Sequence, residues 1–132
     1  MNILKGKIES INVNGGLSIV RVKVGDLSFS SIVIDTPETD PFLKIDNDIQ
    51  IIFKENEVII GIGNMKGISL RNKIPGIIKS IDSDKLLSKI VVESSVGDIT
   101  SIITSNAVEQ LQVKVGSQVT AMIKTNEVML SK

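Results

Sequence analysis

The chain has 132 residues, of which 42% are hydrophobic, so it can bury the core of one ordinary domain or of two minimal ones. Lysine plus arginine number 15, as do aspartate plus glutamate, and this zero net charge gives no overall field to attract a polyanion. Cysteine and histidine are both absent. We therefore expect no thiolate or imidazole metal site and no enzyme.

The lack of cysteine is also typical of a reducing compartment. No stretch approaches the roughly 20 apolar residues that a membrane span needs, and the first residues carry no hydrophobic signal-peptide core. We expect a cytoplasmic protein that binds neither membrane nor nucleic acid.

The chain contains an internal duplication. A shift of 70 residues superimposes many identical residues, more than β-rich sequences share by chance. The apolar residues are dominated by isoleucine and valine, which favour strands. The matched positions include Gly6 with Gly76, Ile8 with Ile78, Val22 with Val92, Ser31 with Ser101, Lys54 with Lys124 and Glu57 with Glu127.

Each copy reads as three strands joined by hairpins, a connection, and two final strands. In the first copy a Gly-Asp turn at residues 25–26 separates the second strand from the third. The acidic, proline-bounded segment 35–41 is expected to be an irregular surface loop. Residues 61–67 contain three glycines and predict a linker, either a hinge or an exchanged segment.

In the second copy, Asn106 is expected to cap a short helix over residues 107–111, with Glu109 reaching back to the cap, and Gly116 ends the connection. The strands of this copy are expected at residues 77–81, 86–94, 99–104, 118–124 and 128–131.

This pattern predicts an all-β protein of two tandem OB-like repeats, each a five-stranded Greek-key β-barrel with a short helical turn. The predicted boundaries are residues 1–62 for the first repeat, 63–67 for the glycine-rich linker and 68–132 for the second repeat.

One motif carries the functional prediction. Residues 69–72 read Ser-Leu-Arg-Asn, and residues 100–104, 108–111 and 119–125 read Thr-Ser-Ile-Ile-Thr, Val-Glu-Gln-Leu and Val-Thr-Ala-Met-Ile-Lys-Thr. Together they resemble the molybdate-binding Mop domain, which is related to TOBE domains. A Mop repeat opens with Ser-Ala-Arg-Asn and ends in a strand carrying lysine and a small residue. The resemblance covers residues 68–132 and departs in the motif only at Leu70.

The resemblance implies binding of a tetrahedral oxyanion, molybdate or tungstate. Such a dianion needs several directed donors, because stripping its water without replacement costs several kcal/mol. Ser69 and Thr125 offer hydroxyls, Lys124 offers an ammonium, and Leu70 and Arg71 offer backbone N–H groups. The guanidinium of Arg71 either contributes to the site or braces the loop.

In the Mop family the oxyanion pockets lie between repeats or subunits, which adds Thr104 to the candidates and implies a homo-oligomer, a dimer or larger. Asn72, Ser101 and Lys54 are further candidates. Alternate residues of a strand face opposite ways, so Ser101 faces the anion, packs inside or faces solvent.

The first repeat lacks most of this set. The shift places Met1 on Arg71, Ile34 stands for Thr104, and Glu55 replaces Thr125, where a carboxylate would repel a dianion. Only the lysine of the final strand, Lys54, is kept. The first repeat therefore either only completes the fold or forms one wall of its partner's oxyanion pocket.

Three functions compete. The first is non-enzymatic binding of molybdate or tungstate for storage, buffering or homeostasis. The second is a structural, interaction or sensing module that has lost most oxyanion binding. The third is an OB-type nucleic-acid binder, which normally shows stacking aromatics and a basic groove. Three scattered phenylalanines, Phe29, Phe42 and Phe53, and zero net charge supply neither.

Overall fold

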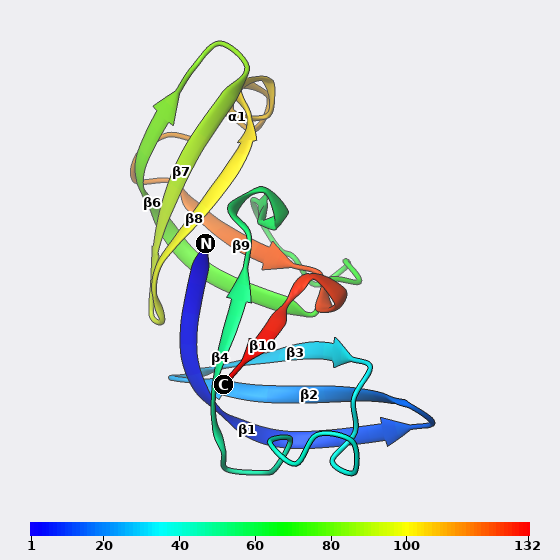
Figure 1. The fold of residues 1–132 in the computed structure, drawn as a ribbon. Coiled ribbons are helices and arrows are strands. Elements are labelled where there is room, and N and C mark those ends of the chain that lie inside the picture. The colour runs from blue at the N-terminus through cyan, green and yellow to red at the C-terminus, as the bar shows by residue number, and fades with distance from the viewer.

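The computed structural model describes residues 1–132 and arranges them as two β lobes, one above the other, with the N-terminus between them (Figure 1). Each lobe is built on one five-stranded antiparallel sheet, which confirms the predicted all-β class. The first sheet contains β1 (Asn2–Asn14), β2 (Leu17–Val24), β3 (Leu27–Val33), β4 (Asp48–Phe53) and β10 (Met129–Ser131). The second contains β5 (Ile59–Gly61), β6 (Asn72–Ser83), β7 (Leu87–Ser94), β8 (Gly97–Thr104) and β9 (Gln118–Ile123).

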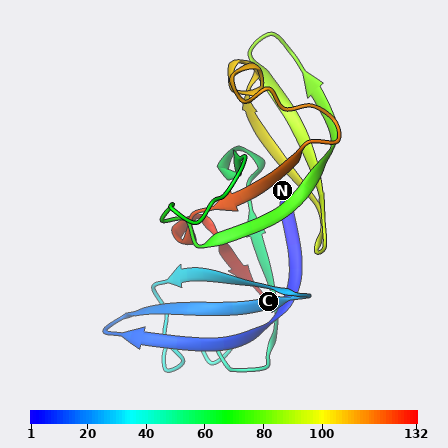
Figure 2. The same cartoon turned by 180° about the vertical axis from the view of Figure 1, so that it is seen from behind.

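The two lobes exchange their last strands. The order is β10-β4-β1-β2-β3 in one sheet and β5-β9-β6-β7-β8 in the other. Strand β5 therefore leaves the first lobe to pair with β9, and β10 returns to pair with β4, as both views of the ribbon show (Figures 1 and 2). Of the two possibilities left open for the linker, the structure has the exchanged segment.

β-Branched side chains fill the core. Strand β2 alternates strictly between exposed and buried residues, so Val20, Val22 and Val24 point inward while their neighbours face solvent. Phe29 and Phe53 are the largest fully buried side chains. Burial of one face per strand is what fixes the register of each sheet.

The duplication is visible in the strand geometry. A β-bulge interrupts β1 between Ile8 and Ser10, and another interrupts β6 between Ile78 and Ser80, exactly one repeat further along. Beside the second bulge, a Cβ on Gly76 would lie 2.5 Å from the carbonyl oxygen of Glu93. Only glycine lets the two backbones approach this closely.

The short elements are the helix α1 (Ser105–Leu111) and two 3-10 turns, η1 (Glu55–Glu57) and η2 (Thr125–Glu127). The helix occurs only in the second repeat, and residues 35–41 of the first form turns and irregular backbone, as expected. The predicted cap was wrong. Thr104, still extended at the end of β8, accepts a hydrogen bond from the Ala107 N–H at 3.1 Å, which places Asn106 inside the helix.

Strand β6 is longer than predicted because it serves two partners. Its first half, from Asn72 to Ile77, pairs with β9, and its second half pairs with β7. Pro75 lies within β6, and its neighbours continue the hydrogen-bonded pairing with the adjacent strands.

No helix of the chain has both the length and the apolar character to cross a membrane.

The close approach at Gly76 gives a stability test. Gly76→Ala is expected to lower the free energy of unfolding by about 1–3 kcal/mol, the usual cost of overpacking, because the added methyl meets backbone and the Val92 side chain at 2.5 Å. Gly67→Ala is the matched control, since nothing lies within 4 Å of its Cβ position. Urea denaturation compares the two, and equal stability of both variants would contradict the role of Gly76.

Candidate functional site

The Ser-Leu-Arg-Asn motif lies where the two lobes meet. Its last residue, Asn72, opens β6 and is completely buried. The Asn72 side-chain oxygen accepts from the Ser30 N–H at 2.7 Å, and its amide nitrogen donates to the Ser30 carbonyl at 2.9 Å. Ser30 belongs to β3 of the other lobe. Asn72 therefore fastens the motif to the opposite sheet.

The pairing of β6 with β9 brings the lysine-containing turn to the same place. Asn72 pairs with Ile123 at the end of the β6–β9 ladder, so Arg71 and Lys124 lie at the same end of neighbouring strands. Thr125 follows in η2, which packs against β3. We call this group, Ser69, Leu70, Arg71, Lys124 and Thr125, the second-repeat site.

The polar groups of the second-repeat site are largely unused inside the chain. The Ser69 hydroxyl, the Lys124 ammonium and the Thr125 hydroxyl make no hydrogen bond or ion pair with the protein. The N–H groups of residues 69–71 likewise donate to no loop or turn partner. Several donors therefore remain available at one end of β6 and β9.

Arg71 has a bracing role in this structure. Its guanidinium donates to the Ile68 carbonyl at 2.7 Å and to the Ser69 carbonyl at 3.4 Å, so the side chain curls back over its own loop. Neither Arg71 nor Lys124 is paired with a carboxylate. The positive charge of both side chains is left uncompensated by ion pairs.

Thr104 and Ser101 lie apart from this group. Both are on β8, which packs against η1 rather than η2. Ser101 is completely buried and donates to the Val58 carbonyl at 2.8 Å, while Thr104 caps α1. A single chain does not bring Thr104 to Ser69 and Lys124, so its place in a pocket remains a prediction that needs another copy.

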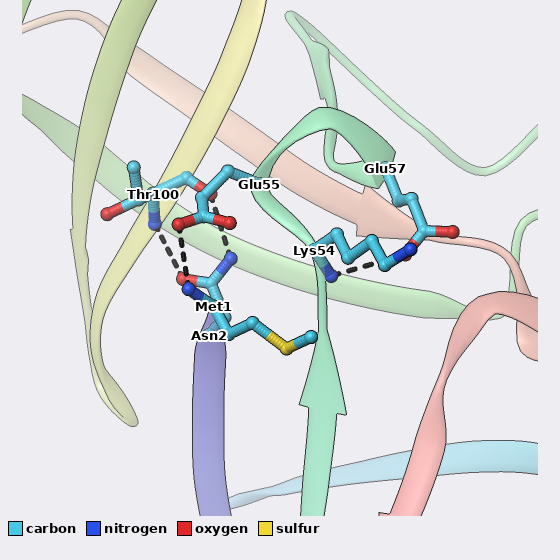
Figure 3. Close-up of polar contacts among 6 residues, drawn as sticks. All are labelled: Met1, Asn2, Lys54, Glu55, Glu57 and Thr100. Atoms are coloured by element: carbon cyan, nitrogen blue, oxygen red, sulfur yellow. Dashed lines mark hydrogen bonds and ion pairs between the residues drawn. The ribbon is translucent and has the colours of Figure 1, made fainter.

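The equivalent place in the first repeat, drawn in Figure 3, has the same kind of asparagine–backbone contact. The side chain of Asn2 exchanges two hydrogen bonds of 2.9 Å with the backbone of Thr100 on β8. Here, however, the α-ammonium of Met1 donates to Glu55 at 2.8 Å. We call this group, Met1, Asn2, Lys54, Glu55 and Thr100, the first-repeat position.

One ion pair of the first-repeat position joins the Met1 ammonium to the Glu55 carboxylate. The hydrogen bond from the Met1 ammonium, followed by one from backbone, lowers the pKa of the Glu55 carboxyl, and the charge of Lys89 adds to this effect. Lys54, the further candidate of the first repeat, precedes Glu55 in the chain and is exposed, and its side chain extends toward Glu57 (Figure 3). Glu55 is therefore ionised at neutral pH.

Two acidic side chains meet between the 3-10 turns. Glu57 of η1 and Glu127 of η2 are equivalent by the 70-residue shift. A hydrogen bond with Glu57, together with burial and the charge of Glu57, raises the pKa of Glu127, while Lys124 opposes this. The Glu57 carboxylate also accepts from the Lys54 N–H at 3.2 Å (Figure 3). The two turns therefore repel each other when both carboxylates are charged.

A surface hollow of about 550 Å³ lies elsewhere and is lined by residues around Gly76, such as Pro75 and Thr120. Its counterpart of about 520 Å³ surrounds Gly6. Both follow from the glycine beside each bulge, so they belong to the repeated fold. Neither contains a residue of the second-repeat site.

Sequence reasoning missed Ser30 and Thr100, whose backbones hold the two asparagines, and Ser31, which donates to the Val128 carbonyl at 2.6 Å. The repeat alignment contained a signal, because Ser31 falls on Ser101 and each donates to a carbonyl of the other repeat. The same residue type in both copies pointed to a shared structural role.

Fold and site together define a tandem OB-like protein in which exposed hydrogen-bond donors without a partner in the chain lie at the lobe junction. Comparisons agree: a TOBE-domain model matches residues 68–130. Molybdenum-pterin-binding protein 3 of Clostridium pasteurianum is 38% identical over 64 residues, which are 48% of this chain and 94% of that protein. Molybdenum-pterin-binding protein MopB of Rhodobacter capsulatus is 26% identical over 129 residues, 95% of this chain and 47% of MopB.

The chain therefore belongs to the Mop family of TOBE-domain proteins, as its sequence predicted. A solved structure described as the cytoplasmic molybdate-binding protein ModG, with molybdate bound, has the same fold, with a TM-score of 0.88. It covers 98% of this chain and 94% of ModG at 22% identity. The tandem arrangement of two OB-like barrels is thus confirmed.

The Glu57–Glu127 pair predicts a pH-dependent stability. Because the folded-state pKa of Glu127 is raised, its contribution to stability is present at acidic pH and is lost as pH rises through that pKa. Glu127→Gln is therefore expected to stabilise the protein at pH 7–8, by about 0.2–1 kcal/mol as for partly exposed charge pairs, and to have little effect near pH 4. Thermal unfolding across this pH range measures the difference, and a variant that is less stable than the wild type at pH 8 would contradict the repulsion.

Proposed function

We propose that this protein binds molybdate or tungstate at the second-repeat site, without making or breaking a bond, and serves to store or buffer the oxyanion in the cytoplasm. The family relationship supports the ligand class, since the relatives are named for molybdenum-pterin or molybdate binding. The location rests on the description of ModG as cytoplasmic.

The observation that carries the proposal is the set of donors without partners. Hydroxyls of Ser69 and Thr125, the ammonium of Lys124 and the backbone N–H groups of residues 69–71 have no acceptor within the chain. Each would replace one hydrogen bond that the dianion loses when it leaves water. No carboxylate pairs with Arg71 or Lys124, so their charge favours an anion.

Arg71 supports the site indirectly in this proposal. Because its guanidinium donates to the carbonyls of both Ile68 and Ser69, we expect the loop to be held in one arrangement. Asn72 fixes the other end of the loop to β3. Donors that are held in place before binding lose less conformational entropy when the anion arrives.

The site is open on its outer side, and we propose that a second copy of the chain closes it. The family pattern adds Thr104 to the candidate site, and this residue is the last of β8, apart from the second-repeat site. Fifteen large apolar side chains are exposed, among them Ile34 at 84% and Leu86 at 76%, which leaves apolar surface for an interface between copies.

Other functions have less support. Phe29 and Phe53 are buried, so they cannot stack on bases as an OB-type nucleic-acid binder requires. A purely structural module is favoured only by the first-repeat position, where Glu55 has taken the place of a donor. The partnerless donors of the second repeat favour binding.

Titration calorimetry with molybdate, tungstate and sulfate tests the proposal. We expect heat with molybdate or tungstate, and a loss of at least tenfold in affinity in Lys124→Glu, because a carboxylate would then face the dianion. Lys85→Glu is the matched control: it makes the same charge change at an exposed residue of the β6–β7 hairpin, and we expect wild-type affinity. No heat with either oxyanion at micromolar protein would refute the proposed function.

Light scattering tests the proposed closure by a second copy. The wild type is expected to be a dimer or larger, because one chain does not combine Thr104 with the second-repeat site. Thr104→Val is expected to weaken oxyanion binding while the oligomer persists. A monomer that binds molybdate as tightly as the wild-type preparation would show that no second copy is needed.

A further inference from the structure

We propose that the carboxylate of Glu55 is a built-in anion that occupies the first-repeat position and so restricts oxyanion binding to the second repeat. In this view the first repeat has kept the hydrogen-bond framework that surrounds the second-repeat site and carries a carboxylate of its own chain there. The inference rests on the proposed function, which assigns the equivalent place in the second repeat to an oxyanion.

The two positions share one framework of hydrogen bonds. Asn2 contacts the Thr100 backbone at 2.9 and 2.9 Å, and Asn72 contacts the Ser30 backbone at 2.7 and 2.9 Å. Thr100 and Ser30 are themselves related by the shift of 70 residues. The chain therefore approaches the two positions in the same way.

A second pair of contacts repeats the framework on the other side. Ser101 donates to the Val58 carbonyl at 2.8 Å, and Ser31 donates to the Val128 carbonyl at 2.6 Å. Val58 and Val128 directly follow η1 and η2, so these bonds hold both 3-10 turns against the opposite lobe. Glu55 and Thr125, the first residues of those turns, are thus placed equivalently.

The surroundings of Glu55 are those of a bound anion. Its carboxylate accepts from the Met1 ammonium at 2.8 Å, follows Lys54 in the chain and is attracted by Lys89. The side chain of Glu55 is 33% exposed, so it is partly withdrawn from water. Two carboxylate oxygens offer the acceptors that an oxyanion would offer, at half the charge of a dianion.

The second repeat shows the same place without the internal anion. Thr125 replaces Glu55, and Lys124 replaces Lys54. The Thr125 hydroxyl and the Lys124 ammonium have no partner in the chain. Removing the carboxylate from Glu55 should therefore leave positive groups without a counter-charge and open a second place for an oxyanion.

Glu55→Thr is the direct test, because it copies the residue of the second repeat. Equilibrium dialysis against molybdate measures the number of oxyanions bound per chain. We expect this number to rise by one relative to the wild type. Asp48→Asn is the matched control, since it removes a carboxylate that pairs with Lys7 at 2.7 Å away from this position, and it is expected to leave the number unchanged.

A second variant keeps the test decisive if threonine disturbs the fold. Glu55→Gln preserves the size of the side chain and removes only its charge, and it too is expected to bind one additional molybdate per chain, more weakly. Circular dichroism confirms that each variant is folded. Folded Glu55→Thr and Glu55→Gln proteins that bind the wild-type number of oxyanions would overturn the inference.

The experiments distinguish a failure of this inference from a failure of the proposed function. A wild type that binds molybdate at the second-repeat site, with unchanged binding in both Glu55 variants, refutes the built-in anion alone. A wild type that binds no molybdate refutes the proposed function, and a gain of one bound oxyanion in Glu55→Thr would still support the built-in anion. Oxyanion binding by the wild-type first repeat itself would contradict it.

Discussion

The exchange of the last strands between the lobes is the constraint on which the rest of the structure depends. Because β5 and β10 cross over, each 3-10 turn packs against the third strand of the opposite lobe. The buried amides of Asn2 and Asn72 then find their partners across the junction, and an unpaired one would cost about 1–3 kcal/mol. Stability of the junction and placement of the donors thus have the same origin.

This constraint also explains how two equivalent places came to differ. The framework uses backbone atoms as partners: the asparagines bind the backbones of Ser30 and Thr100, and the serines bind carbonyls. Side chains that point away from these bonds are free to change without loss of the fold. Glu55 and Thr125 occupy such positions: the Glu55 carboxylate accepts from the Met1 ammonium, whereas the Thr125 hydroxyl has no partner in the chain.

Local patterns in the sequence predicted most of the strands and turns. They did not predict which strands pair across the two lobes. The alternation of apolar and polar residues, the glycine turns and the acidic, proline-bounded segment predicted most elements, because these features depend on residues that are close together in the sequence. The strand exchange was left open, since β5 and β10 have the same sequence pattern whichever sheet they join. Thr104 and Asn106 are both good cap residues, and the length of β8 decided between them. Likewise Asn72 and Ser101 are chemically suitable for an anion, yet their hydrogen bonds are used by the opposite lobe.

Local charge and donor spacing, rather than net charge, decide what such a chain can bind. Its overall charge is zero, but the ion pairs involve neither Lys124 nor Arg71, so a positive region remains at one end of β6 and β9. Charge alone cannot separate molybdate from sulfate, since both are dianions. Discrimination must come from the distances between donors, and these are set by residues that need not touch the anion: Asn72 anchored on Ser30, and Arg71 bracing its own loop. The selectivity of the proposed site would therefore depend on the lobe junction as much as on the donors themselves.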